Sequence, residues 1–165
     1  MFTLQDFKVK LVNGEEVKSF IKKHGEFAAV CYNTPLDRAE KVGEHCLKSG
    51  HMSGSRHLFF VFELKTVPRS AVDQLVRHYT GFVPNVQSLR YCNKDGKVNI
   101  YVAPELLQNE YMVKTIQDQE NIVNAQYNYI QTYLEESGIT GEKANEIART
   151  ILPIGVATEC SIACN

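Results

Sequence analysis

Hydrophobic and polar positions alternate over residues 7–12, which is the pattern of a half-buried strand. A second strand is predicted over residues 57–67. Its Phe59, Val61 and Leu64 depart from strict alternation, which indicates burial on both faces over part of its length. Two further extended segments are predicted on either side of a turn at residues 93–96, which holds an Asp-Gly pair; they are residues 86–92 and 98–102.

Apolar residues spaced three and four apart predict helices in most of the remaining chain. The predicted helices are residues 15–32, interrupted near Gly25; residues 35–49, closed by Gly50; residues 70–78; and residues 140–151, capped by Thr140.

Residues 104–137 form either one long helix or a pair of helices. Their apolar positions recur at helical spacing and are Tyr111, Val113, Ile116, Ile122, Ala125, Tyr129 and Tyr133. A long apolar-faced helix in a small protein often packs against a partner subunit. The pattern therefore favours an oligomer.

Composition narrows the class of protein. The 165 residues suit one domain over residues 1–165, and a net charge of −1 gives no general attraction to nucleic acid or to an anionic membrane. Any anion site must therefore be local. No secretion signal and no apolar run long enough to span a membrane are seen, so we expect a cytoplasmic protein.

The five cysteines are odd in number, and without a secretion signal they favour free thiols in a reducing cytosol. Cys160 and Cys164 lie four apart, but no neighbouring His or Cys pair completes a metal-binding set. We expect no metal site, and we interpret the cysteines as small buried hydrophobic residues.

The richest stretch for chemistry is residues 74–91. Gln74, Arg77 and His78 share one face at helical spacing, and beside the Gly-Pro turn such a face can clamp a phosphate or an electron-rich ring. The alternative is that Arg77 pairs with Asp73 on the surface and that His78 is a solvated helix end.

In an extended segment, Ser88 and Arg90 point to one face and Gln87 to the other. Ser88 and Arg90 can hold a phosphate or a planar acceptor group, while Gln87 can reach another ligand. The alternative is a polar outer face of a strand. No base is spaced to activate Ser88 as a nucleophile, so we interpret it as a substrate-binding hydroxyl.

Two more segments carry candidate residues. The Gly/Ser-rich loop from His51 to His57 can present backbone N–H groups and hydroxyls to a phosphate, although an ordinary loop explains it equally well. Arg149 lies near the C-terminal end of a predicted helix, before Leu152-Pro153. There its positive charge either interacts favourably with the helix dipole or reaches across an interface.

These motifs, taken in order, resemble the flavin-dependent thymidylate synthase family. They are His51-x-Ser53 with His57, Gln74-x-x-Arg77-His78, Asn85-x-x-Ser88-x-Arg90-Tyr91 and Ala148-Arg149-x-x-Leu152-Pro153. The resemblance covers nearly the whole chain. It implies an α+β fold with a mostly antiparallel central sheet, flanking helices and a long helical region.

The resemblance also implies an activity: reductive methylation of dUMP to dTMP, with methylenetetrahydrofolate as carbon donor, FAD as hydride carrier and NADPH as reductant. It implies a homotetramer whose active sites lie between subunits. The residues expected to hold dUMP are Gln74, Arg77, Gln87, Ser88, Arg90 and, from another subunit, Arg149. Ser88 and Arg90 would also act on the uracil, since arginine stabilises the negative charge that builds there.

The residues expected to hold FAD are His51, Ser53, Arg77, His78, Tyr79, Asn85 and Asn165. The flavin carries the difficult chemistry, so no side-chain nucleophile is required. Three features depart from the family signature: Tyr79 replaces an arginine, the middle serine is lost within residues 81–84, and Val86 replaces a glutamate. In the loop before the Phe-rich strand, Arg56 stands where the family usually has an acidic residue.

Family members continue past the asparagine that matches Asn165, so we expect the chain to be a fragment or a naturally shortened member. The alternatives are a relative that binds flavin or nucleotide without methylating, and an unrelated small phosphate-binding protein.

Overall fold

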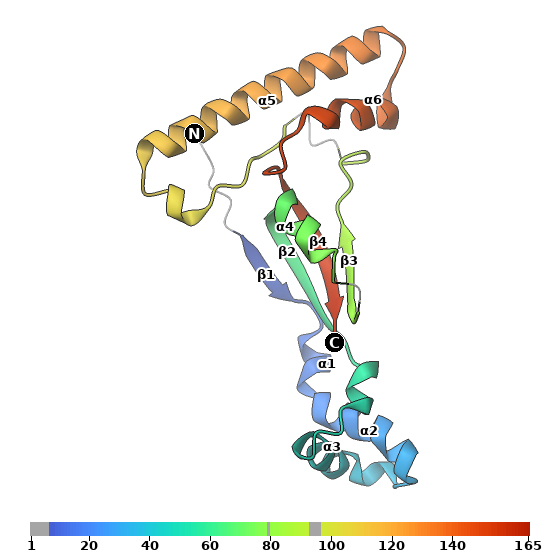
Figure 1. Cartoon of the computed structure of the whole chain (residues 1–165). Coiled ribbons are helices and arrows are strands. Elements are labelled where there is room, and N and C mark those ends of the chain that lie inside the picture. Colours follow the sequence, from blue (N-terminus) through green and yellow to red (C-terminus); the bar gives the residue numbers. More distant parts are fainter. Residues whose placement is uncertain (1–6, 79, 93–96) are drawn as a thin grey trace. The chain divides into compact units, whose positions relative to one another are not determined.

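The computed structural model describes residues 7–78, 80–92 and 97–165 of the chain. Four strands form one antiparallel sheet in the order β1-β2-β4-β3 (Figure 1). Their bounds are β1 Lys8–Leu11, β2 Phe60–Pro68, β3 Phe82–Val86 and β4 Ala157–Cys164. Because helices lie between consecutive strands along the described chain, the fold class is α+β, and this prediction is confirmed.

The described chain divides into two compact units. The first unit comprises residues 7–8, 65–75, 86–92 and 97–160, and the second comprises residues 9–64, 76–78, 80–85 and 161–165. Each candidate ligand set falls almost wholly within one of these units, so the units are described separately.

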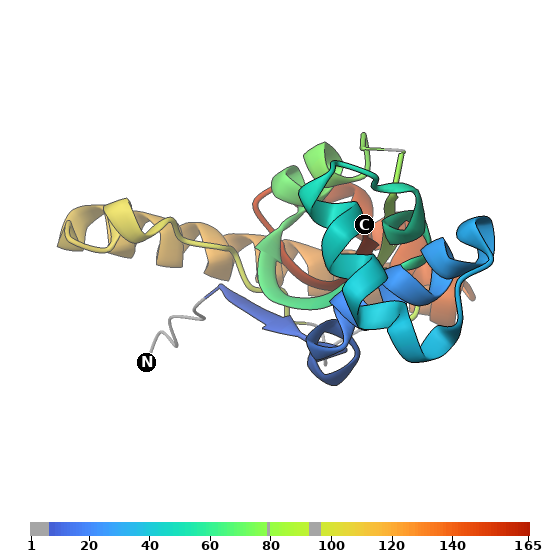
Figure 2. The same ribbon diagram turned by 90° about the horizontal axis from the view of Figure 1, so that it is seen from below.

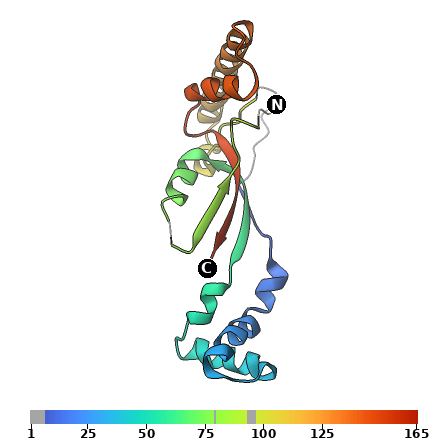
Figure 3. The same ribbon diagram turned by 90° about the vertical axis from the view of Figure 1, so that its right-hand side faces the viewer.

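The first unit contains helices α4 (Arg69–Leu75), α5 (Glu110–Glu136) and α6 (Gly141–Ala148), with short 3-10 turns η3 (Pro104–Leu106) and η4 (Arg149–Ile151). Asn109 caps the N-terminus of α5, because its side chain accepts the Met112 N–H. α6 lies beside α5 (Figures 1 and 3). α5 buries Val123, Tyr127, Gln131 and Leu134 along one face. This buried face is where α6 packs.

The second unit contains α1 (Gly14–Lys18), α2 (Phe20–Tyr32) and α3 (Ala39–Lys48), with 3-10 turns η1 (Leu36–Arg38) and η2 (Ser53–His57). α2 and α3 pack closely against each other (Figure 2). Two glycines permit this approach, because a Cβ added at Gly25 would lie 1.7 Å from the Ala39 carbonyl oxygen. A Cβ at Gly43 would lie 2.0 Å from the Ile21 oxygen.

Several predicted elements are confirmed with shifted bounds, and some are wrong. The interruption in the first helical region lies at Ser19 and not at Gly25, which is inside α2. The first strand is present as β1, but all its residues are exposed, so it is not half-buried. α4 ends at Leu75, two residues before Arg77, because the chain turns there to enter β3.

The extended segments predicted after residue 85 are the main error. The strand is β3, residues 82–86, and the chain then turns, with Cys92 N–H donating to the Ser88 carbonyl at 3.0 Å. Residues 98–102 form only an isolated antiparallel bridge between Ile100 and Val156. The turn predicted at residues 93–96 lies outside the described residues.

The long helical region resolves into the single helix α5, but its predicted apolar face is largely exposed. Tyr111 is 73% exposed, Tyr129 75% and Tyr133 62%. The buried face lies on the opposite side of the helix, at residues 123, 127, 131 and 134. α5 therefore has two apolar faces, of which the first unit covers one.

Candidate functional site

The candidate nucleotide residues are grouped in the first unit. They are Gln74, Gln87, Ser88, Arg90 and Arg149. Gln74 is exposed on α4, while the other four are partly buried. Arg77, which was assigned to both ligands, lies exposed in the second unit.

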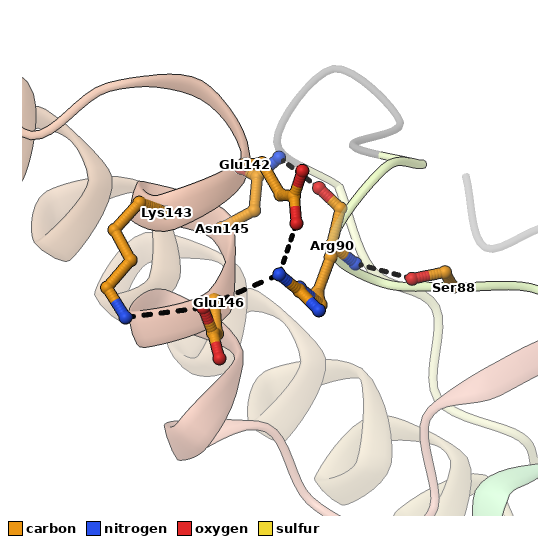
Figure 4. A network of polar contacts seen from close by, with 6 residues as sticks. All are labelled: Ser88, Arg90, Glu142, Lys143, Asn145 and Glu146. Carbon is orange, nitrogen blue, oxygen red and sulfur yellow. Dashed lines mark hydrogen bonds and ion pairs between the residues drawn. The ribbon is translucent and has the colours of Figure 1, made fainter.

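The turn after β3 brings Ser88 and Arg90 together, although not on one face of a strand as predicted. Ser88 Oγ accepts the Arg90 backbone N–H at 3.2 Å, which closes a local turn (Figure 4). The Arg90 carbonyl in turn accepts the side-chain amide of Asn145 at 2.8 Å. Both bonds involve the backbone of Arg90, so they fix its position and leave its guanidinium for other partners.

A buried polar chain supports this turn from behind. Asn145 Oδ1 accepts from Gln131 Nε2 at 2.7 Å, and Gln131 Nε2 also lies 3.4 Å from the Tyr127 hydroxyl. Gln131 and Asn145 are each only 9% exposed. Buried amides are costly to leave unpaired, so this chain fixes the spacing of α5, α6 and the Arg90 turn.

The Arg90 guanidinium faces two carboxylates of α6. Its Nη2 forms a short ion pair with Glu142 Oε1 and lies 3.8 Å from Glu146 Oε2 (Figure 4). The pKa of Glu146 is lowered, first by the hydrogen bond from Lys143 at 3.3 Å and then by the charges of Lys143 and Arg90. The lowered pKa favours the charged form of Glu146, with which an anionic ligand of Arg90 would compete.

Two observations show that the Arg90 guanidinium can take a further partner. Its Nε is buried and makes no hydrogen bond within the described part of the chain. Its side chain as a whole is 38% exposed, so solvent and ligands reach the guanidinium. A guanidinium offers five donors, and the two carboxylates do not use all of them.

Arg69 is a second cation of this region, which sequence reasoning missed. Its Nη2 donates to the Gln87 carbonyl at 2.6 Å, and its buried Nε has no partner among the described residues. Burial lowers the pKa of Arg69, and the positive charge of Arg149 lowers it further. The charges of Arg69 and Arg149 therefore repel each other, and the Asp73 carboxylate offsets part of that repulsion at Arg69.

Gln87 also lines a small cavity of the first unit, with Thr66, Tyr127 and Thr158 among its neighbours. Its volume is ≈ 40 Å³, which is room for a few water molecules and not for a nucleotide. The Thr158 hydroxyl is buried there without a partner among the described residues. A water molecule bound to Thr158 is a physically reasonable occupant.

The candidate flavin residues lie in the second unit. His51 is held at two points: its carbonyl lies 3.1 Å from Nε2 of the fully buried His24, and its Nδ1 lies 3.2 Å from the Tyr32 hydroxyl. Ser53 follows as the first residue of η2. The predicted Gly/Ser-rich loop is thus an anchored turn, and the His51 and Ser53 side chains are exposed.

Asn165 joins two distant parts of the second unit. Its backbone N–H donates to the Gly81 carbonyl and its side-chain amide to the Arg56 carbonyl, each at 3.1 Å. Gly81 has a φ of +68°, and a Cβ there would lie 2.3 Å from Asn165 Oδ1. Glycine at position 81 therefore permits this contact.

The remaining candidates lie near the same turn. The His78 ring packs edge-on against Phe82 with 6.0 Å between centroids, and Asn85 is exposed on β3. Tyr79 lies outside the described residues.

No group of three metal-ligating side chains occurs among the residues that the structure describes. No described helix is both long and apolar enough to cross a membrane. All five cysteines are free thiols, with Cys46 and Cys160 buried as predicted and Cys31 and Cys92 exposed, contrary to the prediction. Burial raises the pKa of Cys160, which disfavours its thiolate.

The four-stranded antiparallel sheet and the helices between its strands define an α+β protein. Two crystal structures of a UMP/dUMP methylase, PolB from Streptomyces cacaoi, align with 98% of this chain. The complex with 5-Br UMP gives a TM-score of 0.58 at 19% identity and is covered over 72% of its length. The complex with 5-Br dUMP gives 0.61 at 21% identity and is covered over 73%.

The chain belongs to the family described as thymidylate synthase complementing protein, whose model matches residues 19–165. A flavin-dependent thymidylate synthase from Nitratidesulfovibrio vulgaris (strain Hildenborough) is 36% identical over 121 residues. The match covers 72% of this chain and 48% of that relative, so the chain spans about half the length of the relative.

Proposed function

We propose that this chain acts in the FAD-dependent reductive methylation of dUMP to dTMP, with methylenetetrahydrofolate as carbon donor and NADPH as reductant. Family membership supports the proposal. The structural observation that carries it is the Arg90 turn, in which Ser88 and Asn145 fix the backbone while the guanidinium, paired with α6, stays partly exposed. A preorganised arginine of this kind suits a dianionic nucleotide phosphate.

Several side chains would share the work of holding dUMP. Arg90 would take the phosphate together with Arg149 from another subunit, and Arg69 adds positive charge beside Arg149 within each chain. Ser88 Oγ uses a lone pair on the Arg90 N–H, so its own proton remains to donate to a uracil oxygen. The amides of Gln74 and Gln87 and the guanidinium of Arg77 complete the proposed set.

Arginine near the pyrimidine carbonyls would stabilise the negative charge that develops on uracil as its C5 becomes nucleophilic. Such stabilisation is strongest when the donors are already in place before the reaction. The buried chain from Tyr127 through Gln131 to Asn145 provides that preorganisation for Arg90.

The second unit offers donors that fit a flavin nucleotide. Two imidazoles, a hydroxyl and an amide are exposed there at His51, His78, Ser53 and Asn85. When bound, FAD would supply the hydride transfer that turns a transferred methylene into a methyl group. Asn165 and Arg77 belong to the same proposed set, as does Tyr79.

We also propose a homo-oligomer, a tetramer with active sites shared between subunits. The support is the exposed apolar stripe on α5, formed by Ile122, Tyr129 and Tyr133 together with Tyr111. A stripe of this kind on one helix is unusual for a surface that faces only water.

The test is a reconstitution with FAD, dUMP, methylenetetrahydrofolate and NADPH, with dTMP quantified by chromatography. Product that depends on all four additions supports the proposal. If flavin and dUMP bind and no dTMP forms, the chain is a non-catalytic binding relative, a reading that Val86 in the signature favours. If neither ligand binds, the proposal is refuted.

A further inference from the structure

A basic groove lies in the second unit, beside α3, with a volume of ≈ 460 Å³. Arg38, Lys41 and His45 line it. These positions are three and four residues apart, so they share one face of the continuous segment formed by η1 and α3. The proposed function uses none of these three side chains.

Charge is segregated along this segment. The acidic residues Glu40 and Glu44 are offset from the basic face, and Glu44 lies 3.8 Å from Lys48, which is not among the groove residues. Within the described part of the chain, neither Arg38 nor Lys41 has an ion-pair partner. The basic face is therefore available to an anionic ligand.

The rest of the groove is not purely electrostatic. Val42 and the buried Cys46 give it an apolar side, and Tyr32 and His51 border it, joined by their 3.2 Å hydrogen bond. Such a lining suits a ligand with a flat apolar body and a charged tail. His51 also belongs to the candidate cofactor set, so the groove begins at a residue already proposed to contact a ligand.

We propose that this groove binds the glutamyl tail of the folate carbon donor, an inference that rests on the proposed function. The three basic positions follow one another over seven residues, or about 10 Å of helix. Groups arranged in a line suit the successive carboxylates of a γ-linked glutamyl chain. A single compact phosphate would need donors that converge on one point. The aminobenzoyl ring lies against Val42 and Tyr32.

The test compares folates that differ only in tail length. Isothermal titration calorimetry with monoglutamyl and pentaglutamyl tetrahydrofolate is applied to the full chain and to the double variant Arg38→Gln, Lys41→Gln. We expect the chain to bind the pentaglutamate more tightly, and the double variant to lose about three- to thirtyfold of that preference, the scale of two exposed ion pairs. Lys48→Gln, on the same helix outside the groove, is the matched control and keeps the preference.

Two outcomes overturn the inference. One is an unchanged preference for the pentaglutamate in the double variant. The other is equal affinity of the unsubstituted chain for the two folates, since the groove would then contribute nothing to binding of the tail. Binding is measured without turnover, so failure of the groove is distinguishable from failure of the proposed function, which is read as absence of dTMP.

Discussion

Arg90 combines a fixed backbone with a partly exposed guanidinium, and its truncation tests the proposed nucleotide site directly. We expect Arg90→Ala to weaken dUMP binding by about 1.5–3 kcal/mol, the scale of a hydrogen bond to a charged group. Calorimetric titration of dUMP measures the change. Lys143→Ala serves as control, because within the described part of the chain the Lys143 ammonium pairs with Glu146 and not with Arg90. An unchanged dUMP affinity would refute the assignment of Arg90.

Glu142 occupies Arg90 in the ligand-free protein, so it competes with an incoming phosphate. We expect Glu142→Gln to strengthen dUMP binding by up to about fivefold, since an exposed ion pair contributes up to about 1 kcal/mol. The same titration, repeated at raised salt, measures the effect, and the gain shrinks as salt screens the pair. Weaker dUMP binding by the variant would mean that Glu142 positions Arg90 and does not compete for it.

Arg69 connects the nucleotide turn to α4 through the Gln87 carbonyl. We expect Arg69→Met to lower the free energy of unfolding by about 1–3 kcal/mol, because a buried carbonyl loses its charged donor. We also expect Arg69→Met to weaken dUMP binding. Arg69→Lys should give an affinity between those of the variant and the wild type, because lysine restores the charge but not the planar set of donors. Thermal unfolding and dUMP titration of both variants measure the changes in stability and affinity. Wild-type stability and affinity in Arg69→Met would exclude a role of Arg69 in the fold and in dUMP binding.

The sequence predicted residues whose chemistry is evident and missed those whose role depends on distant contacts. Ser88 and Arg90 are recognisable from type and spacing, but their turn geometry depends on Asn145, which is 55 residues further on. Arg69, Gln131 and Asn145 offered no local signal. Gln131 stands four residues after Tyr127 on α5, and that spacing is the only hint of their contact.

At the scale of elements, the α2–α3 pair depends on two glycines. A methyl group at Gly25 would strike the Ala39 carbonyl, and backbone atoms cannot move aside cheaply. We expect Gly25→Ala to destabilise the protein by about 1–3 kcal/mol or more, the range for overpacking. Chemical denaturation measures it. Gly14→Ala is the control, because its nearest contact would be an ordinary 3.8 Å; equal stability of both variants would contradict the packing argument.

The elements also show which sequence patterns were sufficient to locate a helix or a strand. Helical periodicity located α2, α3, α5 and α6, because each buries a stripe. β3 was missed because Pro84 and the preceding glycine read as a turn, while an edge strand tolerates a proline. β4 carried no earlier assignment, although Thr158, Cys160 and Ile162 alternate as buried residues.

At the scale of the whole molecule, α5 has one buried and one exposed apolar face, and the proposed assembly depends on the exposed one. Its buried face uses Val123, Tyr127 and Leu134, and the sequence pattern that predicted an apolar face had selected the opposite, exposed one. Periodicity detects an apolar stripe without telling which partner covers it. That the chain forms one domain and that its active sites are shared between subunits stay predictions.

The exposed apolar stripe on α5 makes oligomerisation testable with a double substitution. We expect Tyr129→Ser with Tyr133→Ser to lower the molar mass measured by light scattering from that of a multimer toward one chain of 18.7 kDa, because large aromatic side chains dominate interface energetics. Both tyrosines are well exposed, so the fold of a single chain should survive, as circular dichroism would verify. Asn128→Ser, exposed on a flank of the same helix, is the matched control and should keep the multimer. A wild-type chain that is monomeric at all concentrations, or a double variant with unchanged mass, would show that this stripe is not the subunit interface.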